Sequence, residues 1–186
     1  HGNLGAVLKD IGEPLEGLKS VRRSLEIAPE ASSVRSNLLF IAHSLEDQLN
    51  DDMLFAEAKT FGEIAAQQAK PAFHWNNQPD PDRRLKVGLV SGDLCLHPVG
   101  FFIEGVLHSL AKRASGNLEI FAYSNFPRVD SVTERIKARC QHWKEIFGRT
   151  DEEVAKLIQQ DQIDILIDLA GHTARNRLPI FAWKPA

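Results

Sequence analysis

Two loops of this chain carry the residue types best suited to chemistry. They hold Asp93, His97 and Pro98 in the first loop and Gly171, His172 and Thr173 in the second. Each loop directly follows a run of β-branched and aliphatic residues, the pattern of a buried parallel strand that delivers functional groups at its carboxyl end. If the two strands are neighbours in a sheet, the two loops form one site.

His97 lies between the first strand and a helix predicted over residues 99–113. Pro98 disfavours helical angles at His97 but suits the first position of a helix. The imidazole therefore lies at the positive end of the helix dipole, which disfavours its protonated form. A neutral imidazole can accept a proton or donate a hydrogen bond to a sugar hydroxyl or a phosphate oxygen. The alternative is a histidine that only caps its own helix.

The second loop offers close backbone approach, an imidazole, a hydroxyl and two guanidinium groups, from Gly171, His172, Thr173, Arg175 and Arg177. We expect a further helix to begin near Asn176, with an N-terminus that suits an anion. Asp168 lies inside the preceding strand, where we interpret it as a structural carboxylate bonded to nearby backbone or to His172 rather than as a catalytic group.

Several kinds of site are disfavoured by what the sequence lacks. The first loop has neither the glycine pattern of a dinucleotide fold nor the lysine of a phosphate-binding P-loop. No Gly-x-Ser-x-Gly elbow indicates a hydrolase. Four further histidines have no partners at metal-ligand spacing, namely His43, His74, His108 and His142. Asp80 and Asp82 have the spacing of a metal-diphosphate site, but the adjacent prolines argue against it. We predict no metal site.

The length, composition and net charge of the chain limit the class of protein. The chain has 186 residues, 43% of them hydrophobic, with 22 Lys+Arg against 25 Asp+Glu for a net charge of −3. This size and composition suit one ordinary domain with an appendage, and the charge favours neither nucleic acid nor a membrane surface as partner. Two cysteines and no long apolar span suit a cytoplasmic protein. Because the chain lacks an initial Met and stops mid-pattern at Ala186, we expect a fragment.

Alternating strand and helix signals occupy residues 85–186. The strands are predicted at residues 85–91, 118–124, 142–147 and 163–169, and the helices at residues 99–113, 129–139 and 151–160. This alternation predicts an α/β fold, with a parallel sheet covered by helices on both faces. We therefore expect a Rossmann-like domain.

Residues 1–69 are predicted to be helical, with a break at Gly12 and two apolar faces, one of Leu4, Val7, Leu8 and Ile11 and one of Leu15, Leu18, Val21, Leu25 and Ile27. The spacing of small and large residues over the first 29 positions is similar to a tetratricopeptide repeat. A generic helical hairpin is the alternative. A second, degenerate helical pair follows at residues 31–44 and 51–69, capped by Asn50 or Asp51. Residues 70–84, with three prolines, are predicted to be a linker.

Taken together, these segments resemble a known family. The stretches RLKVGLVSGDLCLHPVGFFIEGVL, FAYSN, DSVTERIKARCQHWKEI and DILIDLAGHTARNRLPIFAWKPA are similar to the amino-terminal catalytic half of the protein O-GlcNAc transferase and SPINDLY family, glycosyltransferase family 41, in its bacterial form. The segments SNLLF and FAEAKTFGE resemble the helices that join the repeats of this family to its catalytic region. The resemblance covers nearly the whole chain.

The resemblance implies an inverting, metal-independent glycosyltransferase of GT-B fold, in which two Rossmann-like domains hold a nucleotide sugar between them. It needs no cofactor, and the repeats present the protein acceptor. His97 matches the His-Pro histidine of the family, for which the proposed role is that of a base or of a contact to sugar and acceptor. Asp93 and Pro98 belong to the same motif, and Gly171, His172 and Thr173 match the loop that faces the bound sugar. Animal members have Tyr at the position of His172, so that role need not be proton transfer.

The resemblance leaves the donor and the activity open. UDP-GlcNAc is the favoured donor, and GDP-fucose, used by SPINDLY-like members, is the alternative. The domain that holds the nucleotide and supplies a lysine to the leaving diphosphate lies beyond Ala186, so the chain by itself is expected to be inactive. A non-catalytic repeat scaffold and a small flavodoxin-like nucleotide binder are alternatives from other classes.

Overall fold

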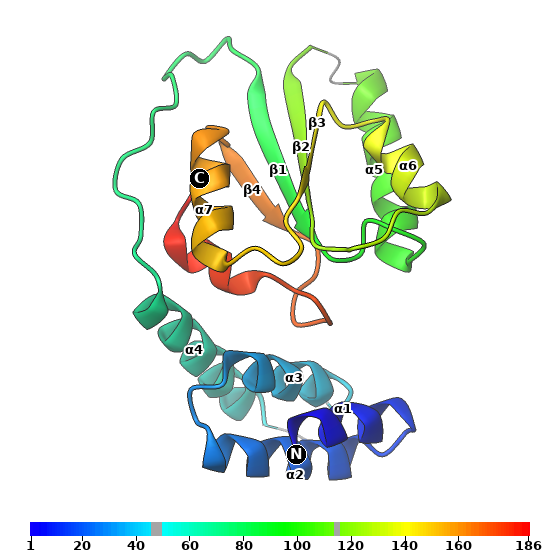
Figure 1. Cartoon of the computed structure of the whole chain (residues 1–186), viewed down its shortest axis with the longest axis vertical. Coiled ribbons are helices and arrows are strands. Elements are labelled where there is room, and N and C mark those ends of the chain that lie inside the picture. Colours follow the sequence, from blue (N-terminus) through cyan, green and yellow to red (C-terminus); the bar gives the residue numbers. More distant parts are fainter. Residues whose placement is uncertain (46–49, 114–115) are drawn as a thin grey trace. The chain divides into compact units, whose positions relative to one another are not determined.

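The computed structural model describes residues 1–45, 50–113 and 116–186 (Figure 1). The chain divides into two compact units, His1–Ala69 and Lys70–Ala186. The first unit is helical and the second is built on a β-sheet.

The described part of the first unit folds as successive helices that pack on one another. They are α1 (Gly2–Asp10), α2 (Pro14–Ile27), α3 (Ser32–His43) and α4 (Asp51–Gln68). Glycines allow α1 and α2 to approach closely, because a Cβ added at Gly5 would lie 2.8 Å from the carbonyl oxygen of Gly17. Asn50 is the N-cap of α4, and its side chain accepts a hydrogen bond from the N–H of Asp52 at 2.8 Å.

Of the apolar face predicted on α1, only Leu8 packs against α2, where it is half-buried beside Gly17. Leu4, Val7 and Ile11 are more than half exposed, while α1 meets α2 and α3 through the side that carries Gly2 and Gly5. Glycines on this side bring the backbones together, so the three exposed side chains point away from the contact. The core of the unit comes from α2, α3 and α4, and its buried apolar residues include Leu18, Val21, Leu25, Leu38, Leu39, Ile41, Ala42, Phe61 and Ile64.

The second unit contains a parallel sheet with the strand order β3-β2-β1-β4. Its strands are β1 (Leu85–Ser91), β2 (Leu118–Ser124), β3 (His142–Glu145) and β4 (Ile165–Asp168). The two central strands have the predicted bounds, because long apolar runs specify them. The two outer strands are shorter than predicted, since each pairs on one side only.

Helices cover both faces of this sheet (Figure 1). They are α5 (Pro98–Arg113), α6 (Ser131–Lys137), α7 (Asp151–Gln160) and the 3-10 helix η2 (Leu178–Trp183). One buried cluster joins β1 and β2 to α5 and α6, and a second joins the other face to α7 and η2. The α/β fold with a Rossmann-like parallel sheet is thus confirmed.

The segment predicted to be a linker belongs to the second unit. Residues 70–84 form no helix or strand, but they lie along the sheet. The N–H of Ala72 donates to the carbonyl of Trp183 at 2.8 Å, and the indole N–H of Trp75 donates to the carbonyl of Lys184 at 3.1 Å. At the far end of the segment, Arg83 forms an ion pair with Asp164. Long-range bonds of this kind leave no signal in local sequence.

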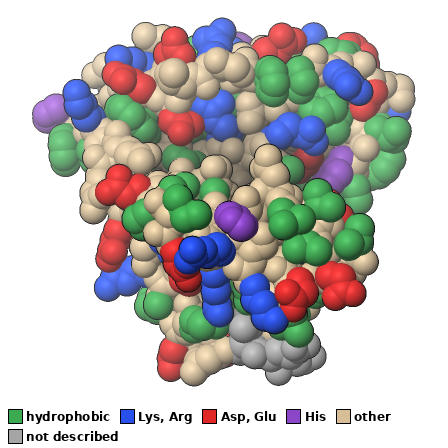
Figure 2. Space-filling model, turned by 60° about the horizontal axis from the view of Figure 1, so that its bottom comes forward, with side chains coloured by type: hydrophobic (Ala, Val, Ile, Leu, Met, Phe, Trp, Pro, Cys, Tyr) green, Lys and Arg blue, Asp and Glu red, His purple; other side chains and the backbone are tan. Residues whose placement is uncertain are grey.

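Charges of both signs are intermingled on the surface seen in Figure 2, where Lys and Arg lie beside Asp and Glu. This mixing is consistent with the small net charge of −3. Among the described residues, none of the helices combines the length and hydropathy needed to cross a bilayer.

Candidate functional site

The two histidine-bearing loops leave the sheet side by side. β1 lies between β2 and β4, so the strand order reverses direction at β1. Val90 of β1 is in register with Asp168 of β4, and the N–H of Leu169 donates to the carbonyl of Val90 at 3.0 Å. In open α/β sheets, ligands bind outside the carboxyl ends of the strands at such a reversal. The predicted adjacency of the two strands is confirmed.

The first loop is held by a residue that the sequence analysis missed. One carboxylate oxygen of Asp130 accepts from the N–H of Leu96 at 2.7 Å, and the other caps α6 by accepting from the N–H groups of Val132 and Thr133. The hydroxyl of Thr133 donates to the carbonyl of Leu94 at 3.1 Å. Hydrogen bonds from Thr133 and Leu96 lower the pKa of Asp130. Asp130 therefore fixes the loop as an anion.

His97 caps the helix that it precedes. Its ring Nδ1 accepts from the N–H of Val99 at 3.3 Å, and its carbonyl accepts from the N–H of Phe101 at 3.1 Å. Because Nδ1 is the acceptor, the proton of the neutral ring lies on Nε2. Nε2 has no partner within the described residues, and the side chain is only partly buried. The ring thus presents a hydrogen-bond donor, and Pro98 stands exposed at the first position of α5.

The second loop is shaped by the carboxylate at the end of β4. Oδ2 of Asp168 accepts from the N–H groups of Ala170 at 3.2 Å and Gly171 at 2.6 Å. Burial raises the pKa of Asp168. Gly171 is exposed with a φ of +54°, and the hydroxyl of Thr173 donates to the carbonyl of Ala170 at 2.7 Å. His172 is half-buried. The interpretation of Asp168 as bonded to nearby backbone is confirmed.

The helix predicted near Asn176 is the 3-10 helix η2, which begins at Leu178, so the α-helical N-terminus expected to suit an anion does not form there. Asn176 turns back on the loop instead, with its side-chain amide donating to the carbonyl of Thr173 at 2.8 Å. Arg175 has a φ of +61°, outside the helical region, and Pro179 lies at the start of the 3-10 helix that follows. The local pattern did not reveal this turn.

Arg175 connects the two loops. Its carbonyl accepts from the side-chain amide of Asn125 at 2.8 Å, and its guanidinium lies 4.8 Å from the ring centre of Phe126. The same guanidinium is 3.7 Å from Oδ1 of the buried Asp93. A Cβ added at Gly92 would lie 2.7 Å from the Cβ of Arg175, so glycine is required where this residue crosses the first loop. The structure thus brings Asp93 against the second loop.

The guanidinium of Arg177, in contrast, has a structural role. It forms an ion pair with Asp151 at 2.7 Å and donates to the backbone carbonyls of Ile146 at 3.3 Å and Arg149 at 3.0 Å. Its side chain is 11% exposed. Of the two guanidiniums that the sequence offered for an anion, only that of Arg175, 43% exposed, remains accessible.

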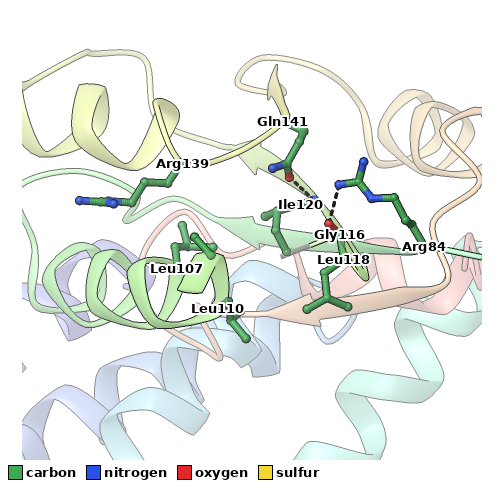
Figure 3. Close-up of a pocket in the computed structure, with 9 residues that line it drawn as sticks. Arg84, Leu107, Leu110, Gly116, Leu118, Ile120, Arg139 and Gln141 are labelled. Atoms are coloured by element: carbon green, nitrogen blue, oxygen red, sulfur yellow. Dashed lines mark hydrogen bonds between the residues drawn. The ribbon is translucent and has the colours of Figure 1, made fainter. Parts of the chain in front are cut away.

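A separate hollow lies at the opposite edge of the sheet (Figure 3). Its volume is about 180 Å³, and it is lined by Arg84, Leu107, Leu110, Ala111, Gly116, Leu118, Ile120, Arg139 and Gln141. Figure 3 shows Arg84 and Gln141 directed at the backbone of β2, where they bond Leu118 and Ile120. These polar groups fix the beginning of the strand, so this hollow is not the candidate site.

The carboxyl-terminal edge of the sheet suits a polar ligand that is rich in oxygen. Nε2 of His97 and the guanidinium of Arg175 are donors, and the exposed Gly171 allows close approach. No group of three His, Cys, Asp or Glu side chains gathers as metal ligands would in residues 1–45, 50–113 and 116–186. The residues present thus fit sugar hydroxyls or phosphate oxygens.

Comparison with known proteins gives consistent results. The profile of Glycosyl transferase family 41 matches residues 42–186. The SPINDLY proteins of Petunia hybrida and Arabidopsis thaliana, both named probable UDP-N-acetylglucosamine–peptide N-acetylglucosaminyltransferases, are 31% and 30% identical over 87% of the chain. The chain spans 17% and 18% of their lengths, respectively.

A solved structure agrees in fold as well. A lysine-to-methionine mutant of the Thermobaculum terrenum O-GlcNAc transferase superposes with a TM-score of 0.82 and 34% identity, covering 100% of this chain and 35% of that one. The family resemblance noted in the sequence is therefore confirmed. The family profile matches most of the chain, and the chain shares its fold with the Thermobaculum terrenum structure. The chain therefore belongs to glycosyl transferase family 41.

Proposed function

We propose that this chain supplies the acceptor-side half of the active site of a protein O-glycosyltransferase, which transfers GlcNAc from UDP-GlcNAc to Ser or Thr with inversion and without a metal. The observation that carries the proposal is the meeting of two polar loops at the reversal point of the sheet, in a chain of this family. The family members compared above carry names of the same activity.

The reaction forms one bond and breaks another. The acceptor hydroxyl oxygen bonds to the anomeric carbon while the bond from that carbon to the diphosphate oxygen breaks on the opposite face. The proton of the hydroxyl passes to water, and negative charge grows on the departing diphosphate. Hydrogen-bond donors aimed at that charge lower the barrier.

In this proposal His97 acts as a hydrogen-bond donor. Nδ1 is occupied by the N–H of Val99, so accepting a proton at Nε2 would require the other tautomer and the loss of the helix cap. The Nε2–H instead contacts a sugar hydroxyl or a phosphate oxygen. Gly171 and Thr173 face the sugar, His172 lies beside them, and the buried Asp93 positions Arg175.

The rest of the chain has supporting roles. We infer that the helical unit, residues 1–69, contributes to binding the protein acceptor, as the sequence resemblance implies. Cys95 and Cys140 are free thiols, and burial raises the pKa of Cys140 to about 12. Two unreactive free thiols suit the proposed cytoplasmic location.

The proposal is tested by nucleotide binding and transfer. Thermal unfolding of this chain and of the full-length product of its gene is measured with UDP, UDP-GlcNAc, GDP or GDP-fucose, since a ligand that binds the folded state raises its midpoint. We expect UDP and UDP-GlcNAc to stabilise the full-length product, with little shift in residues 1–186 alone. Incorporation of labelled GlcNAc into protein by the full-length product completes the test.

Other outcomes would redirect the proposal. Stabilisation by GDP and GDP-fucose would identify a fucosyltransferase of SPINDLY type. No shift and no transfer by the full-length product would indicate a non-catalytic scaffold. Tight nucleotide binding by residues 85–186 alone would indicate a self-contained nucleotide binder.

A further inference from the structure

The outer edge of the sheet at β3 forms a groove that the proposed function does not use. β3 pairs with β2 on one side, and within the described chain its other side is open. A hollow of about 360 Å³ runs along this edge, lined by Lys137, Trp143, Lys144, Glu145, Arg149 and Leu157. Its floor is β3, and its sides come from α6 and α7.

The backbone of β3 offers unused hydrogen-bonding groups to this groove. The N–H of Ile146 donates to the carbonyl of Ser124 in β2 at 2.9 Å. Because backbone groups alternate in direction along a strand, Lys144 also faces β2, while Trp143 and Glu145 face outward. Their N–H and C=O groups can pair with an added strand.

The groove carries an excess of positive charge. Lys137, Lys144 and Arg149 line it against the single carboxylate of Glu145. Lys137 and Arg149 are exposed and form no ion pair with any residue that the structure describes. Lys144 is 3.3 Å from Asp161. Two of the three cations are therefore available to an acidic partner.

Both sides of the groove carry apolar surface, and the α6 side adds a cation. Trp143 packs against the core on the α6 side, where Lys137 lies, and Leu157 packs against the core on the α7 side. An extended segment sends alternate side chains to opposite faces. Such a segment would therefore contact both sides while its backbone pairs with β3.

We propose that this groove binds an extended, acidic segment of a partner protein, which adds to the sheet as a strand beside β3. Strand addition of this kind takes affinity from the backbone and specificity from pockets for alternate side chains. A lysine on an edge strand, here Lys144, discourages indiscriminate pairing, and the available cations Lys137 and Arg149 favour acidic strands over others. Nucleic acid fits less well, because phosphates only accept hydrogen bonds and would leave the outward C=O groups unpaired.

A labelled probe peptide, Glu-Val-Glu-Val-Glu, tests the proposal on the 186-residue chain. We expect it to bind, as measured by fluorescence anisotropy, while Lys-Val-Lys-Val-Lys and a version with a central Pro do not. Binding should slow hydrogen exchange at the amides of Trp143 and Glu145, with little change at Lys144, which is already paired. Equal binding of the Pro peptide, or no added protection at these two amides, would overturn strand addition.

Charge-reversal variants distinguish the effect of the charges in the groove from the effect of the net charge of the chain. Lys137→Glu with Arg149→Glu should weaken binding of the probe by about tenfold, because two surface attractions are lost and two repulsions replace them. The matched control is Lys112→Glu with Arg113→Glu, two exposed cations at the end of α5, outside the groove lining. We expect this control to weaken the probe by less than twofold, with thermal midpoints unchanged in both variants. Equal weakening by both pairs, or tighter binding of a single-stranded RNA of uridines than of the probe, would overturn the proposal.

Discussion

The two ends of β4 place a carboxylate in opposite situations. Asp164, just before the strand, accepts both N–H groups of the Arg83 guanidinium fork, at 2.5 and 2.6 Å, together with the N–H of Lys86 at 2.8 Å and the amide of Asn77. Asp168, at its end, uses only Oδ2, and its Oδ1 is buried without a partner among the described residues.

The two pKa values move in opposite directions for this reason. The hydrogen bonds from Arg83 hold the pKa of Asp164 well below its usual range, whereas burial raises that of Asp168. At the amino-terminal edge of the sheet the polar groups satisfy one another and stabilise the fold. At the carboxyl-terminal edge Asp168 Oδ1, His97 Nε2 and the Arg175 guanidinium are left incompletely paired, as expected where a ligand binds.

The sharpest test of this contrast is His97→Asn. Asparagine keeps an acceptor for the N–H of Val99 but removes the Nε2–H donor, so we expect the transfer rate of the full-length product to fall about 100-fold or more. The thermal midpoint should not change. His97→Ala, which also loses the cap, should in addition lower stability by about 1 kcal/mol. Full activity in His97→Asn would limit this residue to capping.

At the amino-terminal edge, Asp164→Asn should lower the free energy of unfolding by about 2 kcal/mol, because it weakens charge-assisted hydrogen bonds to Arg83 and Lys86. Tryptophan fluorescence in urea reports this unit alone, since all three tryptophans, Trp75, Trp143 and Trp183, lie in it.

The same variant has a predictable pH dependence. The folded pKa of Asp164 is below its ordinary value of 3.8, so its stabilisation is complete above about pH 4 and is lost as the pH falls towards the folded pKa. The difference between parent and Asp164→Asn should therefore shrink at pH 3. A difference that is equal at pH 3 and pH 7 would contradict the ion pair.

Gly92→Ala tests the crossing of the two loops. The new Cβ would meet the Cβ of Arg175 at 2.7 Å and its carbonyl oxygen at 3.1 Å, so we expect a loss of about 1–2 kcal/mol in the same urea titration. Gly105→Ala in α5 is the control, because nothing lies within 4 Å of its Cβ. That change should be neutral or stabilising by up to about 1 kcal/mol. Similar results for the two variants would show that the crossing imposes no constraint.

The smallest effect, of opposite sign, is expected for Asp168→Asn. The amide oxygen can still accept from Ala170 and Gly171, while the cost of a buried charge disappears, so stability at pH 7 should rise by about 1 kcal/mol. Because the folded pKa of Asp168 is raised, the gain should fade as acid protonates the parent carboxyl group. A loss of stability at pH 7 would show that the negative charge of Asp168 is needed for the fold.

Much of the fold was predictable wherever the signal is local. The apolar runs of β1 and β2 set their bounds, and α7 spans the predicted residues because Thr150 and Glu153 form a capping box at its start. The prolines of residues 70–84 predict a linker but not its bonds to residues 81 to 111 positions away. The helix predicted near Asn176 begins only at Leu178 and is a 3-10 helix, because Arg175 adopts a positive φ that its residue type does not predict.

The candidate site divides in the same way. Pro98 predicted that His97 lies at the start of a helix, and glycine and hydroxyl residues indicated the second loop. Asp130 has the residue type of an N-cap, but its bond to Leu96, 34 positions away, has no sequence signal.

By itself, the sequence determined the strands, the two polar loops that follow them and the helix that begins beside His97, because these depend on patterns within a few residues. Only the tertiary structure decided that Arg175 crosses Gly92 and reaches Asp93 and that Arg177 is structural. It also decided that Asp164 forms an ion pair, while Oδ1 of Asp168 has no partner among the described residues. Burial and partners set the properties of a charged group, and both come from residues that are distant in the chain.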